Sequence, residues 1–115
     1  WQRFNDEHCR CVQFLKASVE KSTAKHIIVA SHHVPSFKLM SDEFEGSALN
    51  GAFTVELSDY IASSPIECWI YGHSHRNIDR VIGNTQCISN QLGYVFQNEH
   101  QSFDAGRMIV IGDDF

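Results

Sequence analysis

The sequence has no excess of basic residues and no long apolar run. Its 9 Lys and Arg residues against 14 Asp and Glu residues give a formal net charge of −5, which argues against a nucleic-acid-binding module held by a basic face. No apolar stretch approaches the ~20 residues that a membrane-spanning helix needs, so no membrane partner is expected. Hydrophobic residues make up 43% of the 115 residues, which predicts one folded domain. The pattern of those residues predicts the mixed α/β class.

No targeting segment is recognisable at the start of the sequence. The chain begins with Trp1 rather than methionine, and residues 1–10 resemble neither a signal peptide nor a transit peptide. We therefore expect a fragment or a processed product, and a cytoplasmic location.

Cysteine occurs in no recognisable metal-binding or disulfide pattern. Cys9 and Cys11 are too close for a comfortable bridge, and neither Cys68 nor Cys87 lies in a C-x-x-C pair. Reduced, mostly buried thiols are the expectation.

Hydrophobic periodicity predicts a mixed sheet with flanking helices. Apolar residues recur at helical spacing over residues 4–20 and again over 48–63. Short apolar runs rich in β-branched residues at 26–30 and 66–71 are typical of central strands, and these two could form a parallel pair.

The remaining residues predict an antiparallel portion and two loops. Gly83-Asn84 between apolar runs indicates a two-residue hairpin, and residues 108–111 are predicted as a last strand. The loop 36–46 and the segment 90–100 are the candidates for substrate contacts.

Histidines gather at the ends of the two predicted central strands. His32 and His33 follow the first strand, and His73 and His75 follow the second, just after Gly72. Ligands collect at the carboxyl ends of parallel strands, and imidazole suits Zn, Mn, Fe, Co or Ni. Two such ions about 3.5–4 Å apart are a recurring device for phosphate-ester hydrolysis. Gly72 is expected to permit the sharp exit from the strand.

These four histidines are therefore predicted site residues. His32, His73 and His75 are predicted metal ligands. The side chain of His33 should point differently from that of His32, because successive strand residues alternate. The other three histidines are expected to be ordinary surface or turn residues: His8, His26 and His100.

Both histidine blocks resemble those of calcineurin-like metallophosphoesterases. Val29-Ala30-Ser31-His32-His33-Val34-Pro35 is similar to the V-x-x-H-H-x-P block of that family, and Tyr71-Gly72-His73-Ser74-His75 to its G-H-x-H block. Ser89-Asn90-Gln91-Leu92-Gly93-Tyr94 looks like the N-x-x-G-Y segment of a bacterial-type branch. The resemblance extends over residues 27–94.

The resemblance implies half of an α-β-β-α sandwich and a phosphoesterase that uses two divalent transition metal ions. His32 and His73 would ligate one ion and His75 the other, with His33 as the catalytic residue. Hydroxide held by the two metals would attack the phosphorus of a phosphomonoester or phosphodiester, either a small molecule or a nucleotide.

Three further blocks of that family, D-x-H, G-D-x-x-D and G-N-H-[DE], are expected to have no counterpart here. Residues 1–115 would then be the C-terminal half of the domain, catalytically incomplete without the missing N-terminal half. Two alternatives stay open. The chain could be a non-catalytic metal-binding or self-association module, for instance a homodimer, or it could be a degenerate homologue without activity.

Overall fold

In the computed structural model, residues 2–41 and 55–112 are described. The chain forms two α-helices, four strands and three short 3₁₀ turns in these parts: α1 (Gln2–Lys21), β1 (Ile28–Ala30), η1 (Phe37–Leu39), α3 (Ser58–Ser63), β2 (Cys68–Ile70), β3 (Arg80–Ile82), β4 (Thr85–Ile88), η3 (Val95–Gln97) and η4 (Glu99–Ser102).

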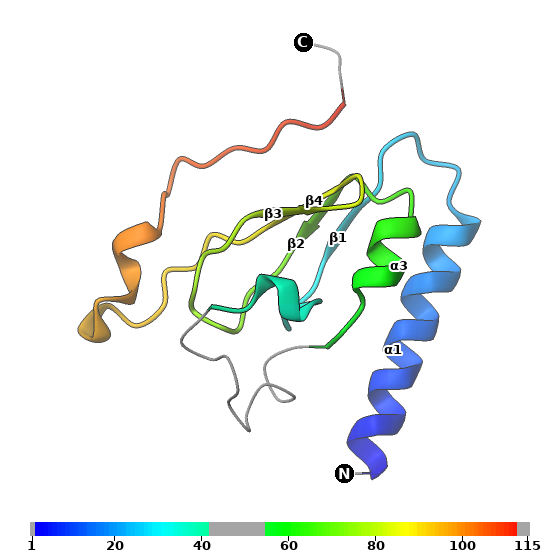
Figure 1. The fold of residues 1–115 in the computed structure, drawn as a ribbon, viewed down its shortest axis with the longest axis horizontal. Coiled ribbons are helices and arrows are strands. Elements are labelled where there is room, and N and C mark those ends of the chain that lie inside the picture. The colour runs from blue at the N-terminus through cyan, green and yellow to red at the C-terminus, as the bar shows by residue number, and fades with distance from the viewer. Residues whose placement is uncertain (1, 42–54, 113–115) are drawn as a thin grey trace.

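The four strands form one mixed sheet in the order β1-β2-β4-β3 (Figure 1). Strand β2 is parallel to both β1 and β4, while β3 pairs with β4 in the antiparallel sense. The parallel pair β1–β2 and the β3–β4 hairpin agree with the sequence, and the mixed α/β class is confirmed. The described strands all belong to this one sheet.

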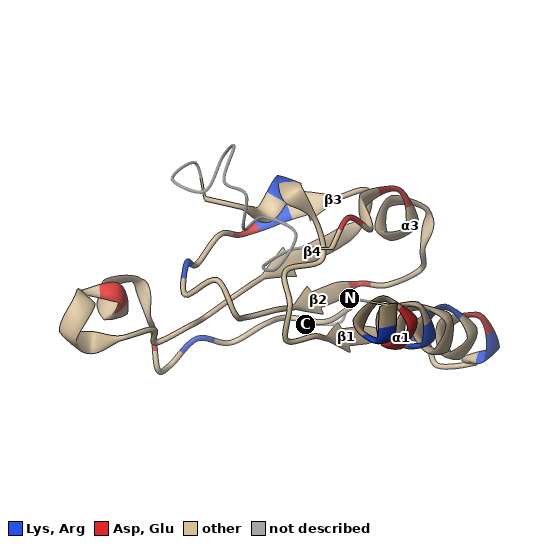
Figure 2. Cartoon of the chain, turned by 90° about the horizontal axis from the view of Figure 1, so that it is seen from below, with Lys and Arg blue, Asp and Glu red and all other residues tan. Residues whose placement is uncertain are grey.

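Helices α1 and α3 lie on the same side of the sheet (Figure 2). Trp69, Ile61 and Val29 are almost fully buried between the helices and the strands. Only the C-terminal half of α1 takes part in this packing. Val19 is buried and Leu15 packs against the core, whereas Phe4 is 57% exposed, so the apolar face predicted over residues 4–20 is not covered at the N-terminal end of the helix.

Of the helix predicted over 48–63, the described residues 55–63 contain only α3, which begins at Ser58. Residues 48–54 lie outside the described residues. The backbone N–H of Val55 donates to the Val34 carbonyl and that of Leu57 to the Pro35 carbonyl, each at 2.9 Å. These long-range backbone bonds compete with a helix over the same residues, which helical spacing alone does not reveal.

The predicted last strand over 108–111 is wrong. Residues 103–112 run back along the sheet without joining its ladder, and Met108 is 88% exposed. Side chains tether this segment: Arg107 pairs with Asp79 at 2.6 Å, and the Gly112 N–H donates to Glu67 at 3.2 Å. The apolar residues 108–111 therefore resemble a strand in composition but lack backbone partners among the strands.

All four cysteines are free, as predicted, but only Cys68 and Cys87 are buried. Within the described residues, no helix is both long enough and apolar enough to cross a membrane.

Candidate functional site

The carboxyl ends of β1 and β2 meet at one edge of the sheet. The register pairs Ala30 with Ile70, and pairing continues beyond the strands. The Ser31 N–H donates to the Ile70 carbonyl at 2.9 Å, and the Gly72 N–H donates to the His32 carbonyl at 3.1 Å. The backbone thereby fixes the two histidine segments side by side.

Three of the four predicted histidines converge there. Ligand nitrogens of His32, His33 and His73 all lie within 4.8 Å of one another, and His73 Nδ1 is 2.9 Å from His32 Nε2. Two nitrogens bound tetrahedrally to one ion at about 2.1 Å would be roughly 3.4 Å apart. The three imidazoles, called the histidine trio below, are ligands of the type that transition metal ions take, and their nitrogen separations, 2.9 Å for one pair and at most 4.8 Å for the others, lie on either side of that distance.

His33 joins this trio against the expectation from strand alternation. Its ring centroid lies 4.9 Å from that of His32 and 4.7 Å from that of His73. Strand β1 ends at Ala30, so the two-residue alternation no longer applies at positions 32 and 33. Both side chains can then face the same way.

The turn after β2 places the left-handed backbone on the histidines themselves. His73 has φ 72° and His75 has φ 57°. Residues other than glycine rarely adopt this left-handed region. Gly72 was expected to supply this freedom, but no positive φ occurs there. Strained backbone at chemically active residues is a recurring property of binding sites.

The neutral imidazole is favoured at His33 and His73. Burial, and then the neighbouring His32 and His8, lower the pKa of His33. Burial, followed by His33, His32 and His75, likewise lowers the pKa of His73. Both rings thus keep a lone pair available for a metal ion near neutral pH.

His75 lies apart from the trio. Its backbone N–H donates to Gln91 Oε1 at 2.8 Å, and its ring packs edge-on against Tyr94 with centroids 4.7 Å apart. Its Nδ1 faces Glu99 Oε1 at 3.3 Å. Hydrogen bonds from Arg76 and then from the Tyr94 N–H lower the pKa of Glu99, with burial opposing them. Sequence reasoning missed Gln91 and Glu99, because neither stands in a recognisable motif beside His75.

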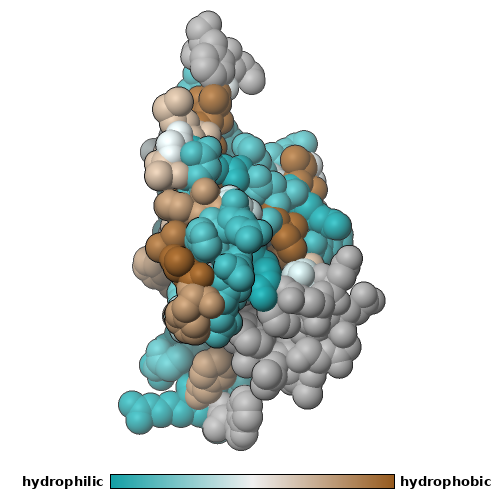
Figure 3. All heavy atoms as spheres, turned by 90° about the vertical axis from the view of Figure 1, so that its left-hand side faces the viewer, coloured by the Kyte–Doolittle hydropathy of each residue, from teal (hydrophilic) through white to brown (hydrophobic). Residues whose placement is uncertain are grey.

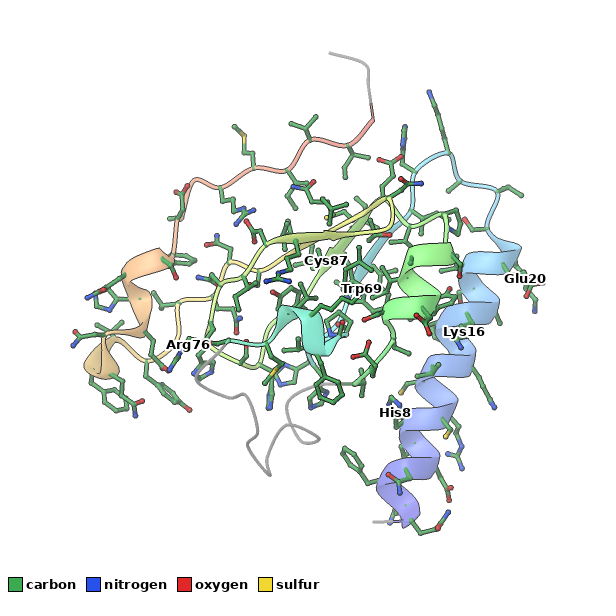
Figure 4. The ribbon with its side chains drawn as sticks, in the orientation of Figure 1. His8, Lys16, Glu20, Trp69, Arg76 and Cys87 are labelled. Atoms are coloured by element: carbon green, nitrogen blue, oxygen red, sulfur yellow. The ribbon has the colours of Figure 1, made fainter. Side chains whose placement is uncertain are left out.

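Sequence reasoning also missed Trp69, which is connected to the backbone of His33. The Trp69 indole N–H donates to Ser31 Oγ at 2.9 Å, and the Ser31 hydroxyl donates to the His33 carbonyl at 2.8 Å. Trp69 is buried in the core and lies between η1 and α3 in the view of Figure 4. A buried side chain of the sheet is thus connected to the backbone of the trio.

Two grooves adjoin the histidines. One of about 350 Å³ lies between α1 and the sheet, is largely apolar, and is lined by His8, His32 and His33 together with residues such as Leu15 and Trp69. The other, of about 430 Å³, is lined by His75 and Glu99 and by polar residues of 97–102. The face that carries residues 92–103 also exposes apolar side chains among polar ones (Figure 3).

The expected absence of a D-x-H sequence needs a correction. Asp6-Glu7-His8 has this spacing, but it lies within α1. Residues two apart on a helix are related by a rotation of roughly 200° about the helix axis. Asp6 and His8 therefore point to nearly opposite sides of α1 and cannot face one site together. His8 is half-buried, is oriented toward the sheet (Figure 4) and lines the apolar groove.

Comparison with known proteins gives one informative match. The chain is 33% identical over 94 residues to the uncharacterized protein L509 of Acanthamoeba polyphaga mimivirus. The match covers 73% of this chain and 31% of the viral protein, so the chain spans less than a third of the length of that relative. No family model and no solved structure matches the chain.

Proposed function

We propose that this chain contributes one wall of the active site of a metal-dependent phosphoesterase. The observation that carries the proposal is the convergence of His32, His33 and His73 at the carboxyl edge of a parallel strand pair, with ligand nitrogens within 4.8 Å. That edge is where α/β sheets bind their ligands. The order and spacing of the two histidine blocks support the same proposal.

We assign each histidine a role within this proposal. His32 and His73, whose facing nitrogens are 2.9 Å apart, would hold one divalent transition metal ion, and His75 would serve a second ion. Such ions supply Lewis-acid polarisation of the phosphate and an activated water. His33, neutral and beside the other two rings, is the residue placed to exchange a proton with the substrate.

The proposed substrate is a phosphomonoester or phosphodiester, either a small molecule or a nucleotide. Carboxylate ligands do not accompany the trio among the described residues, and metal sites for phosphoryl transfer generally include them. We therefore propose that the chain is half of an α-β-β-α sandwich, catalytically incomplete alone, and that an N-terminal half supplies the remaining ligands. The free thiols are consistent with a cytoplasmic location.

Metal titration of the chain tests the first step. We expect Mn²⁺ or Zn²⁺ to bind with a heat signal in calorimetry, and His73→Ala to weaken that binding at least about tenfold. His26→Gln is the matched control. His26 precedes β1 and pairs with Glu67 at the opposite end of the strands, so its replacement should leave metal affinity unchanged. Equal affinity of His73→Ala and the unmodified chain would contradict the proposal.

Hydrolysis tests the second step. A longer protein that contains this chain should hydrolyse p-nitrophenyl phosphate or bis(p-nitrophenyl) phosphate in the presence of Mn²⁺. The variant His33→Ala should lose most of that activity while it retains metal. Activity that is unchanged by both His33→Ala and His73→Ala would contradict the assignment.

A second candidate function is self-association. Strand β1 is an edge of the sheet, its Ile28 is 50% exposed, and Phe14 of α1 is 75% exposed. Edge strands with apolar neighbours favour pairing with another copy. Light scattering decides this point, because a monomer at high concentration would exclude a homodimer.

A further inference from the structure

Glu99 connects three groups around His75. Its Oε1 lies 3.3 Å from His75 Nδ1 and accepts the Tyr94 N–H at 2.7 Å. Its Oε2 accepts from Arg76 Nη1 at 2.6 Å. The Glu99 side chain is only 9% exposed. A carboxylate held by three donors has little freedom to move away from the imidazole.

The backbone is arranged to admit this carboxylate. Gly93 has φ 67°, and a Cβ built on it would lie 2.5 Å from Glu99 Cβ. No other residue type fits position 93 without displacing Glu99. The ring of His75 is held on two further sides, by the Gln91 bond to its backbone N–H and by the Tyr94 ring.

We propose that Glu99 is a positioning residue that fixes His75 in the tautomer with its proton on Nδ1. An ionised carboxylate can only accept hydrogen bonds, so the ring nitrogen that faces it must carry the proton. The lone pair of the neutral ring is then on Nε2. Histidine ligands of metal ions commonly donate their other ring N–H to a carboxylate in this way.

The consequence is a His75 that presents Nε2 to its ligand. The identity of that ligand as a divalent metal ion rests on the proposed function, whereas the tautomer does not. Glu99 also pairs with Arg76 and with the Tyr94 backbone. His75 and Glu99 both line the polar groove, so a change of Glu99 there would also change the orientation of His75.

Long-range ¹H–¹⁵N NMR of the metal-free chain measures the tautomer directly. At a pH where His75 is neutral, we expect the unmodified chain to show the Nδ1–H form. Glu99→Gln, which keeps the shape and an acceptor oxygen, should retain most of it. Glu99→Ala should shift the population toward Nε2–H. Gly93→Ala, which leaves the carboxylate in the chain but displaces it, should act in the same direction as Glu99→Ala.

The matched control is Glu67→Gln, which alters the other carboxylate–histidine pair of the chain, Glu67 with His26. It should leave the His75 signals unchanged. His75 signals in Glu99→Ala and Gly93→Ala that match those of the unmodified chain would overturn the inference.

The two proposals fail separately. If the unmodified chain binds no metal but its His75 tautomer depends on Glu99, the positioning role stands and the proposed metal binding by this chain is refuted. If metal binds but the tautomer does not respond to Glu99, the positioning role is refuted and the metal site stands.

Discussion

His73 Nδ1 lies 2.9 Å from His32 Nε2 although the two residues are 41 positions apart in the chain. The parallel register of β1 and β2 brings their strand ends together, and the bond from the Gly72 N–H to the His32 carbonyl holds the following turn in place. His73 reaches this position only with a left-handed backbone, φ 72°. The contact between the two rings therefore coincides with local strain.

That strain predicts an unusual order of stabilities at position 73. A left-handed conformation costs a residue other than glycine about 1–2 kcal/mol, partly offset by the greater flexibility of glycine in the unfolded chain. We expect His73→Gly to be about 0.5–1 kcal/mol more stable than His73→Ala in urea unfolding. Gly72→Ala is the control, because its new Cβ would meet the His32 carbonyl at an ordinary 3.7 Å. Equal stabilities of the two His73 variants would contradict this account.

The sequence predicted the strands and the hairpin, which depend on the local pattern of apolar and turn residues. The apolar runs located β1 and β2, and Gly83-Asn84 located the hairpin. Because parallel strands end at one edge, the meeting of His32 with His73 followed from the same reasoning.

The features that failed depend on contacts distant in sequence. Leu57 is the N-cap of α3 rather than part of a longer helix, and its backbone N–H donates to the Pro35 carbonyl; helical spacing carries no sign of that partner. The environment of His75 likewise depends on Gln91 and Glu99, and Glu99 returns to the turn only after the positive φ at Gly93 and the 3₁₀ turn η3. Side-chain networks of this kind are set by tertiary packing rather than by any local motif.

The hydrogen bonds from Trp69 to Ser31 and from Ser31 to His33 predict a coupled pair. Ser31→Ala removes the acceptor of the Trp69 indole N–H, and a donor left without a partner costs about 1–3 kcal/mol. Trp69→Phe removes that donor but also leaves a cavity, at a further cost. In a double-mutant cycle we expect Ser31→Ala to cost markedly less in the Trp69→Phe background. Strictly additive unfolding free energies would show that the bond contributes nothing.

Gly83 in the β3–β4 hairpin should not tolerate a side chain. Its φ is 61°, and a Cβ would lie 2.6 Å from the Ala62 carbonyl oxygen in α3. The left-handed backbone costs about 1–2 kcal/mol and the overpacking about as much again, so we expect Gly83→Ala to lower the unfolding free energy by about 2–4 kcal/mol. Gly106→Ala is the matched control, because its Cβ would meet only Asp104 at 3.5 Å. Thermal unfolding that is alike for the two variants would contradict the predicted clash.

Glu56 should make stability depend on pH in the acid range. Burial raises its pKa, but hydrogen bonds from the Ser58 hydroxyl and backbone, the Phe37 N–H and the Ser36 hydroxyl outweigh burial and leave the pKa lowered. A carboxyl with a lower pKa in the folded chain stabilises the fold fully above its unfolded value of 4.5. That contribution is lost as the pH falls through the folded pKa.

The measurement for Glu56 is urea unfolding of the unmodified chain and of Glu56→Gln between pH 7 and pH 3. We expect the unmodified chain to be the more stable near neutral pH and the difference to shrink as the solution is acidified. Glu7→Gln is the control, because the Glu7–Arg10 pair on α1 is largely exposed and such pairs contribute little. A difference between the unmodified chain and Glu56→Gln that stays constant down to pH 3 would show that the Glu56 carboxylate does not anchor residues 55–58 to η1.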